Sequence, residues 1–175
     1  MPNYYSPQGG LPPQEELLTG RAVFTEAYAV IPKGTMRDIT TSLLPHWTAT
    51  RLWVIARPLS GFAETFSHYL MEVASGGGST SPESDSRAEA VLFITDGAAQ
   101  LSVGGTAHTL ETGGYAYLPA GADWELFNPG SEPVRFHWIR KAYVAAENIP
   151  APEAFVTDVS KAETIEMPGT DGRWS

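Results

Sequence analysis

Short segments rich in Val, Ile, Phe, Tyr and Trp follow one another along the chain, and turn-forming residues separate them. Gly, Pro, Asp or Asn interrupts the pattern about every 8–12 residues, as in β-sandwiches and barrels. Between residues 21 and 140 no stretch has the 3.6-residue apolar periodicity of a helix. The sequence predicts an all-β domain with strands at Ala22–Thr25, Tyr28–Ile31, Leu52–Arg57, Thr65–Val73, Ala90–Thr95, Ala99–Val103, Ala107–Leu110, Tyr115–Leu118, Trp124–Phe127 and Val134–Ile139.

Two connections between these segments have distinct compositions. Gly104 and Gly105 separate two predicted strands, which indicates a two-residue hairpin turn. The stretch Ser75–Ser86, with the sequence SGGGSTSPESDS, is polar and too long for a hairpin turn. We expect it to be a flexible loop, and the sequence leaves open whether that loop is functional or a solvated linker.

Composition divides the chain into three parts. Residues 1–20 hold closely spaced Tyr, Pro and Gly and predict an arm with at most one helical turn, at Gln14–Leu18. Residues 21–144 hold the predicted β-domain. Residues 145–175 are acidic and interrupted by proline, and only Phe155–Val159 and Thr164–Met167 resemble strands. We therefore expect a linker-like tail that leads towards a further domain.

Charge and cysteine content exclude several classes of protein. The 175 residues include 11 Lys and Arg against 20 Asp and Glu, which gives a net charge of −9, and there is no Cys. A disulfide scaffold, a Cys-based zinc site and a Cys nucleophile are excluded. The acidic balance argues against nucleic-acid binding. Apolar runs such as Trp53–Ala56 are far shorter than the roughly 20 residues of a membrane span, and Met1–Gly10 is unlike a signal peptide. We expect a cytoplasmic protein with no membrane partner.

One segment resembles the second conserved motif of cupins. That motif reads Gly, five residues, Pro-x-Gly, two residues, His, three residues, Asn, and it is matched in register by Gly113, Pro119, Gly121 and Asn128. The resemblance implies a cupin fold, which is a double-stranded β-helix or jelly-roll barrel. In metal-binding cupins the motif's His points into the barrel, whereas this chain has Trp124 at that position. We expect Trp124 to fill the barrel core, and a stacking platform for a ligand is the alternative.

The first cupin motif ends in a Gly that corresponds to Gly97. Counting back from it, the usual His, His and Glu positions are held by Ser84, Ser86 and Ala90. Glu89 is one residue away from the Glu position, and in a strand this turns a side chain to the other face. Together with Trp124, all four metal positions are therefore replaced. Divalent transition metals need imidazole or carboxylate ligands here, so the sequence predicts no metal site and no catalytic residue.

The four histidines do not rebuild such a site. His46, His68, His108 and His137 are scattered and no two share a metal-ligand spacing, so we interpret them as surface or hydrogen-bonded residues. His68 and His137 lie in predicted strands, and their entry into the barrel lumen stays open. No Ser-His-Asp arrangement is readable either, which argues against Ser84 or Ser86 as a nucleophile.

A wider resemblance covers nearly the whole chain, from about Tyr4 to Trp174. The segments Arg21–Pro32, Arg51–Pro58 and Phe136–Lys141 are similar to the N-terminal half of (S)-ureidoglycine aminohydrolases, also labelled glyoxylate-induced proteins. The resemblance implies an oligomeric bicupin, with two barrels in one chain. Such enzymes hydrolyse (S)-ureidoglycine to (S)-ureidoglycolate and ammonia in purine (allantoin) degradation. They hold manganese in the C-terminal barrel through Glu, His and Gln side chains, and their N-terminal barrel lacks the metal ligands.

The resemblance therefore implies that this chain is the metal-free N-terminal cupin of such a hydrolase. The catalytic manganese site and the small-molecule substrate would require a C-terminal cupin outside this chain, so whether these residues alone form an enzyme stays open. A homo-oligomer or the second cupin is the expected partner. One alternative is a stand-alone cupin module that binds a small ligand, for which Trp124 is the candidate contact. Another is a metal-independent enzyme, which would need a His within hydrogen-bond reach of an Asp or Glu inside the barrel; the sequence does not assign that role to His68 and Glu72.

Overall fold

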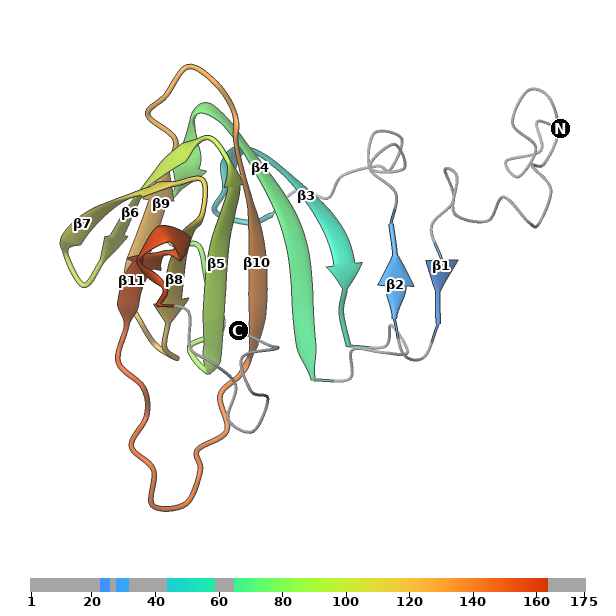
Figure 1. Cartoon of the computed structure of the whole chain (residues 1–175), viewed down its shortest axis with the longest axis vertical. Helices are drawn as coiled ribbons and strands as arrows, with labels where there is room; N and C mark the ends of the chain where they lie inside the picture. Colours follow the sequence, from blue (N-terminus) through green and yellow to red (C-terminus); the bar gives the residue numbers. More distant parts are fainter. Residues whose placement is uncertain (1–22, 26–27, 32–43, 59–64, 164–175) are drawn as a thin grey trace, which may run out of the picture.

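The computed structural model describes residues 23–25, 28–31, 44–58 and 65–163 of the chain. Within these residues, strands form a small two-stranded ribbon and a nine-stranded sheet that curves into a nearly closed barrel (Figure 1). The described helical structure is a single 3-10 turn, Val159–Lys161. The predicted all-β class is therefore confirmed. The helical turn expected at Gln14–Leu18 and the strand expected at Thr164–Met167 lie outside the described residues.

Within the described residues each predicted strand corresponds to a strand of the structure, and the largest differences are an earlier start of β3 and a later end of β4. In chain order the elements are β1 (Val23–Phe24), β2 (Ala29–Val30), β3 (Thr48–Ala56), β4 (Phe66–Ser79), β5 (Ala88–Asp96), β6 (Ala98–Val103), β7 (Thr106–Glu111), β8 (Gly114–Leu118), β9 (Trp124–Phe127), β10 (Val134–Ala142) and β11 (Phe155–Asp158).

The order of strands in the large sheet differs from their order in the chain. It runs β11-β8-β5-β10-β4-β9-β6-β7, with β3 paired to the other edge of β4, and the pairs are antiparallel. β10 thus lies between β4 and β5, although it follows them in the sequence only after β6, β7, β8 and β9. This non-sequential pairing is that of a jelly-roll barrel, which closes most of the sheet edges.

The hairpin between β6 and β7 is confirmed. Val103 pairs with Thr106, and Gly104 and Gly105 form the two-residue turn between them. Their φ angles are 55° and 81°. Positive φ at both central residues is the requirement of a type I′ turn, and glycine meets it without steric cost.

The expectation of a flexible loop at Ser75–Ser86 was wrong for its first part, because β4 continues to Ser79. Gly78 pairs with Thr48 of β3 and with Phe127 of β9, and Ser79 is 2% exposed. A Cβ on Gly78 would lie 2.1 Å from the carbonyl oxygen of Leu126. The glycines at this point therefore permit close contact between backbones rather than flexibility.

The core fills the inside of the barrel with apolar side chains from opposite strands. On β10 the alternate residues Val134, Phe136 and Trp138 are at most 1% exposed, and Met71 of β4 and Leu92 of β5 are fully buried. Burial of each such side chain stabilises the fold by about 1.5–3 kcal/mol. Since successive side chains of a strand point to opposite faces, residues 135, 137 and 139 lie on the outside of the barrel.

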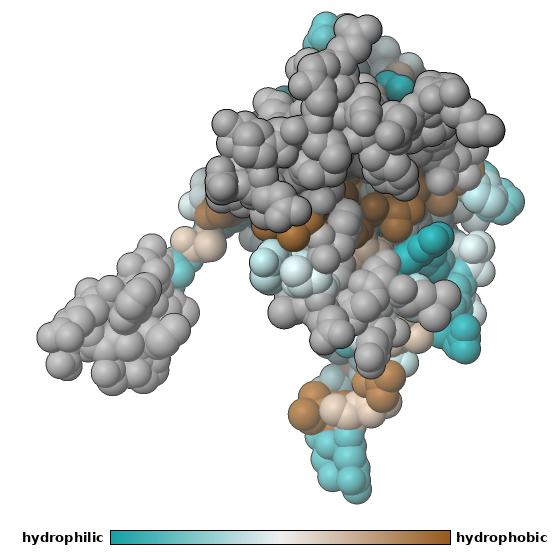
Figure 2. All heavy atoms as spheres, turned by 90° about the vertical axis from the view of Figure 1, so that its right-hand side faces the viewer, coloured by the Kyte–Doolittle hydropathy of each residue, from teal (hydrophilic) through white to brown (hydrophobic). Residues whose placement is uncertain are grey.

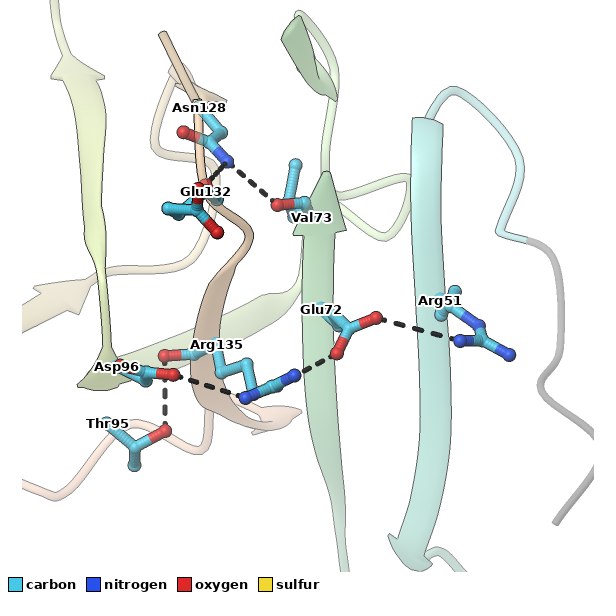
Figure 3. A network of polar contacts seen from close by, with 8 residues as sticks. All are labelled: Arg51, Glu72, Val73, Thr95, Asp96, Asn128, Glu132 and Arg135. Carbon is cyan, nitrogen blue, oxygen red and sulfur yellow. Dashed lines mark hydrogen bonds and ion pairs between the residues drawn. The ribbon is translucent and has the colours of Figure 1, made fainter. Parts of the chain in front are cut away.

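A polar network on the outer face connects four neighbouring strands (Figure 3). Arg135 of β10 donates to Glu72 of β4 at 2.8 Å and to Asp96 of β5 at 3.1 Å, and Arg51 of β3 lies 3.8 Å from Glu72. The side chains of Arg51 and Arg135 are 62% and 46% exposed, so each ion pair contributes less than about 1 kcal/mol. The network therefore links the side chains of β3, β4, β10 and β5 across the outer face and contributes little to stability.

The sheet extends beyond residue 144, where composition placed the start of the tail. The strand expected at Phe155–Val159 is present as β11, which pairs with β8. Phe155 stacks on Tyr115 and Tyr117, with ring centroids 5.7 and 5.8 Å apart. The connection from β10 to β11 projects from the barrel and exposes Val144 and Ile149 (Figure 1).

Apolar residues also reach the surface of the sheet. Phe93 and Ile139, on the outer face, are 36% and 37% exposed. In the view onto the side that carries β3, apolar atoms show in the middle of the face, and hydrophilic atoms lie at its right-hand margin and at its upper and lower ends (Figure 2). The described residues include no helix that is long and apolar enough to cross a membrane.

Candidate functional site

Three tryptophans fill the barrel lumen. Trp124 of β9, which is 4% exposed, lies 6.4 Å from Trp47 and 6.0 Å from Trp138, measured between ring centroids. Trp47 and Trp138 are 5.8 Å apart, and Trp47 also contacts Phe136. These ring pairs have the edge-to-face or tilted geometry that aromatic side chains prefer. The indole of Trp124 therefore packs in the core at the position that the cupin motif gives to a metal-binding histidine.

The four positions that correspond to cupin metal ligands lie around one pocket. Ser84, Ser86, Ala90 and Trp124 all line a pocket of about 170 Å³ at one end of the barrel. Ser84 and Ser86 are exposed at its opening, whereas Ala90 and Trp124 are buried in its wall. Two hydroxyls, a methyl group and an indole do not fit a divalent metal ion. Among the described residues, no three His, Cys, Asp or Glu side chains are grouped to hold one.

A buried carboxylate in this pocket was not anticipated from the sequence. The Glu83 side chain is 10% exposed, and its Oε1 accepts hydrogen bonds from Arg140 at 2.6 Å and from the backbone N–H of Asp85 at 2.8 Å. Its Oε2 is buried and has no hydrogen-bond partner in the chain. Nothing in the local sequence marks Glu83, because Arg140 is 57 positions away and meets it only in the folded barrel.

The segment that carries these residues is held in place on both sides. Trp47 donates its indole N–H to the carbonyl of Pro82 at 3.2 Å. Asp85 accepts from the side chain and the backbone N–H of Arg87, and the hydrogen bonds from Arg87 hold the pKa of the Asp85 carboxyl below its ordinary value. The second half of the expected flexible loop is thus a defined turn over the barrel opening.

Glu89 lies on the outside of the barrel, as the one-residue shift from the motif predicts. Its Oε2 accepts from the Tyr117 hydroxyl at 2.7 Å and its Oε1 lies 3.4 Å from the Lys141 ammonium. Burial and the neighbouring carboxylate raise the pKa of Tyr117 to about 12. Both Glu89 oxygens therefore have partners in the chain, unlike those of Glu83.

His68 and His137 meet on the outer face rather than in the lumen. Nε2 of His68 and Nδ1 of His137 lie 2.8 Å apart. Burial, together with the charge of His137, lowers the pKa of His68 to about 4, and burial lowers the pKa of His137 as well. Glu72, the carboxylate considered as a partner of His68, bonds to Arg135 instead. The arrangement needed for a metal-independent enzyme is therefore not formed by these residues.

The motif's glycines and proline shape the ends of the strands. Gly97, Gly113 and Gly121 have φ angles of 79°, 92° and 76°. Pro119 accepts a hydrogen bond from the backbone N–H of Ala122 at 3.0 Å, which closes the turn between β8 and β9. β9 begins two residues after Ala122, and its first side chain, that of Trp124, lies in the lumen.

Asn128 completes the motif from a buried position (Figure 3). Its Nδ2 donates to the carbonyls of Val73 and Glu132 at 2.9 and 2.8 Å, and its Oδ1 accepts from the N–H of Gly130 at 3.0 Å. At the corner between β9 and β10, this side chain therefore provides the hydrogen-bond partners of two backbone carbonyls and one backbone N–H. Its role in the described structure is to hold that corner.

Comparisons with known proteins agree with the cupin fold. The family model described as a cupin domain matches residues 69–140. A crystal structure described as a glyoxylate-induced protein from Pseudomonas aeruginosa is 53% identical, with a TM-score of 0.79, over 99% of this chain and 62% of that one. No curated protein sequence matches the chain.

Two less similar structures show the fold alone. Protein Ylba from E. coli is 22% identical with a TM-score of 0.74, over 87% of this chain and 61% of that one. A Cupin 2 conserved barrel domain protein from Salinispora arenicola is 20% identical with a TM-score of 0.53, over 66% and 89% of the two chains. The chain therefore spans about three fifths of the Pseudomonas and E. coli structures.

Proposed function

Because residues 69–140 of this chain are a cupin domain, we propose that the chain is the metal-free N-terminal barrel of a bicupin hydrolase, an (S)-ureidoglycine aminohydrolase. The observation that carries this proposal is the 53% identity, across 99% of the chain, to a glyoxylate-induced protein of which the chain spans only 62%. The family resemblance of the sequence segments around Arg21, Arg51 and Phe136 supports the same assignment. Hydrolysis of ureidoglycine, a step of allantoin catabolism, then belongs to the longer protein.

The interior of this barrel supports a division of labour between two barrels. Its lumen is packed with Trp47, Trp124 and Trp138, and the residues at the metal positions do not fit an ion. In the proposal, the manganese site and the reacting groups lie in the second barrel. This chain contributes a rigid support and contacts within a cytoplasmic oligomer, with no part in binding nucleic acid or membranes.

A chimera tests the proposal. The chain alone, and the chain joined to the part of the Pseudomonas aeruginosa protein that it does not cover, would be assayed for ammonia release from (S)-ureidoglycine made in situ. The intact Pseudomonas protein is the reference. We expect ammonia from the chimera and the reference and none from the chain alone. Activity of the chain alone, or an inactive reference, would contradict the proposal.

A further inference from the structure

The outer face of the sheet carries an apolar surface that the proposed function does not use. The strand register places two neighbouring rows of side chains across β11, β8, β5, β10 and β4. In these rows Phe155, Ile139 and Phe93 are 49%, 37% and 36% exposed. We call this surface the outer apolar face, and its apolar members are Phe155, Tyr117, Val91, Phe93, Ile139 and Leu70. Large apolar side chains gathered on one exposed face are typical of a protein–protein contact.

Charged side chains border the outer apolar face, and their charges cancel in ion pairs. At one end Arg135 pairs with Glu72 and Asp96, and at the other end Lys141 pairs with Glu89. The chain as a whole has a net charge of −9, so two copies repel each other over much of their surface. On this face they can meet without facing unpaired like charges. The same neutrality gives a strongly charged partner no electrostatic attraction here.

The outer apolar face has a hollow beside a projecting side chain. Val91, Tyr117 and Ile139 are among the residues around this hollow, which is mainly apolar and has a volume of about 170 Å³. A dry cavity of about 150 Å³ accommodates benzene, so the hollow accommodates a phenyl ring. Phe93 is exposed and follows Val91 by two residues on β5, which places it roughly 7 Å away on the same face. A surface with a ring and a hollow side by side is complementary to a second copy of itself, as a twofold interface requires.

The connection between β10 and β11 begins and ends on strands of this face and projects beyond the sheet (Figure 1). Every residue from Val144 to Phe155 is exposed, and Val144 and Ile149 are 80% and 65% exposed. Five strands about 4.8 Å apart, and the stretch from Arg135 to Lys141, make the face roughly 20 Å wide and 20 Å long. This area is about half of the roughly 800 Å² that each partner contributes to a stable interface. The projecting connection is the adjoining apolar surface that can supply the remainder.

We propose that the outer apolar face binds a second copy of this chain in a twofold dimer. Phe93 of each copy enters the hollow beside Val91 of the other, and the connection between β10 and β11 lies against the partner copy. The ion pairs of Arg135 and Lys141 form the polar rim of the interface. The dimer requires neither the second barrel nor a bound ligand, so it stands independently of the hydrolase assignment.

Light scattering after size-exclusion chromatography of the whole chain tests this inference. At about 50 µM we expect twice the mass of one chain, because interfaces of this size have Kd values in the micromolar range or below. Sedimentation equilibrium over about 1 to 100 µM then gives the Kd of the dimer. The mass of a single chain at about 50 µM would overturn the proposal, and the outer apolar face would then be left to the second barrel of the longer protein.

Variants connect the dimer to this face. Phe93→Glu removes the ring from the hollow and places a carboxylate there instead, so the Kd of the dimer should rise at least tenfold. Phe127→Glu is the matched control and should leave the Kd unchanged, because Phe127 is also 36% exposed but lies on β9, outside the face.

A second variant covers the case in which Phe93→Glu fails to fold. Ile149→Glu then replaces it as the test, since Ile149 is 65% exposed on the projecting connection and the substitution leaves the barrel untouched. It should also weaken the dimer at least tenfold. An unchanged Kd in the folded Phe93→Glu chain or in Ile149→Glu would contradict the assignment of the dimer to this face.

Discussion

Arg140 links the wall of the pocket to the tryptophan cluster in the lumen. Its Nη2 donates to Oε1 of Glu83 at 2.6 Å, and its guanidinium carbon lies 5.5 Å from the ring centroid of Trp138. The side chains of Arg140 and Glu83 are 25% and 10% exposed, so the pair is largely removed from water. A partly buried pair of this kind is sensitive to the loss of either member.

Removal of one charge should therefore cost more than removal of both. We expect Arg140→Met to lower the free energy of unfolding by about 2 kcal/mol, because it leaves the Glu83 carboxylate buried without its cation. The double variant Arg140→Met with Glu83→Gln should recover at least half of that loss. Urea denaturation of the parent, both single variants and the double variant measures the coupling. A double variant that loses the sum of the two single losses would contradict this account of the pair.

The tryptophan cluster predicts a large effect of truncating Trp124. We expect Trp124→Ala to lower the free energy of unfolding by about 3–5 kcal/mol, because the side chain is buried and the surrounding rings collapse only in part. Phe127→Ala on the same strand is the matched control, and since Phe127 is 36% exposed it should lose less than half as much. Similar losses for the two variants would mean that Trp124 does not fill the core.

The histidine pair predicts a dependence of stability on pH. The pKa of His68 is about 4 in the folded chain and 6.5 when it is unperturbed, so between these values the unfolded chain binds more protons. Stability contributed by neutral His68 is therefore complete above about pH 6.5 and is lost as the pH falls towards 4. Relative to the parent, His68→Asn should show a shallower decrease of Tm over this range, while His108→Asn on β7 should keep the parent's decrease. Parallel curves for the parent and His68→Asn would refute the prediction.

Gly78 predicts a steric effect at the junction of three strands. A Cβ there would approach the carbonyl of Leu126 to 2.1 Å, so Gly78→Ala must separate β4 from β9. We expect a loss of roughly 2 kcal/mol or more, whereas Gly76→Ala, whose added Cβ meets nothing within 4 Å, should lose about 1 kcal/mol from its positive φ alone. Thermal unfolding of the two variants decides whether the glycines of this stretch serve close packing.

The strands were predictable because a strand buried on one face is rich in apolar, β-branched and aromatic residues, and turn-forming residues follow it directly in the sequence. Gly104 and Gly105 fixed a hairpin, and the spacing from Gly113 to Asn128 identified the cupin turn and the inward position of Trp124. The extension of β4 to Ser79 was not predictable, since its glycines look the same locally whether they serve flexibility or contact with Leu126. The pairs Glu83–Arg140 and His68–His137 were not predictable either, because the two members of each pair are far apart in the sequence and meet only in the folded barrel.

Tryptophan fills the lumen of this barrel in place of a metal, and the manganese content of the purified chain is a direct test of this arrangement. The purified chain would be incubated with excess Mn²⁺, desalted and analysed for metal, with the intact Pseudomonas aeruginosa protein treated in parallel. We expect less than roughly 0.1 equivalent of manganese in the chain and, under the proposed function, about one equivalent in the longer protein. A stoichiometric ion retained by the chain itself, and lost in Glu83→Gln or in a His68 or His137 variant, would mean that this barrel holds a metal site after all.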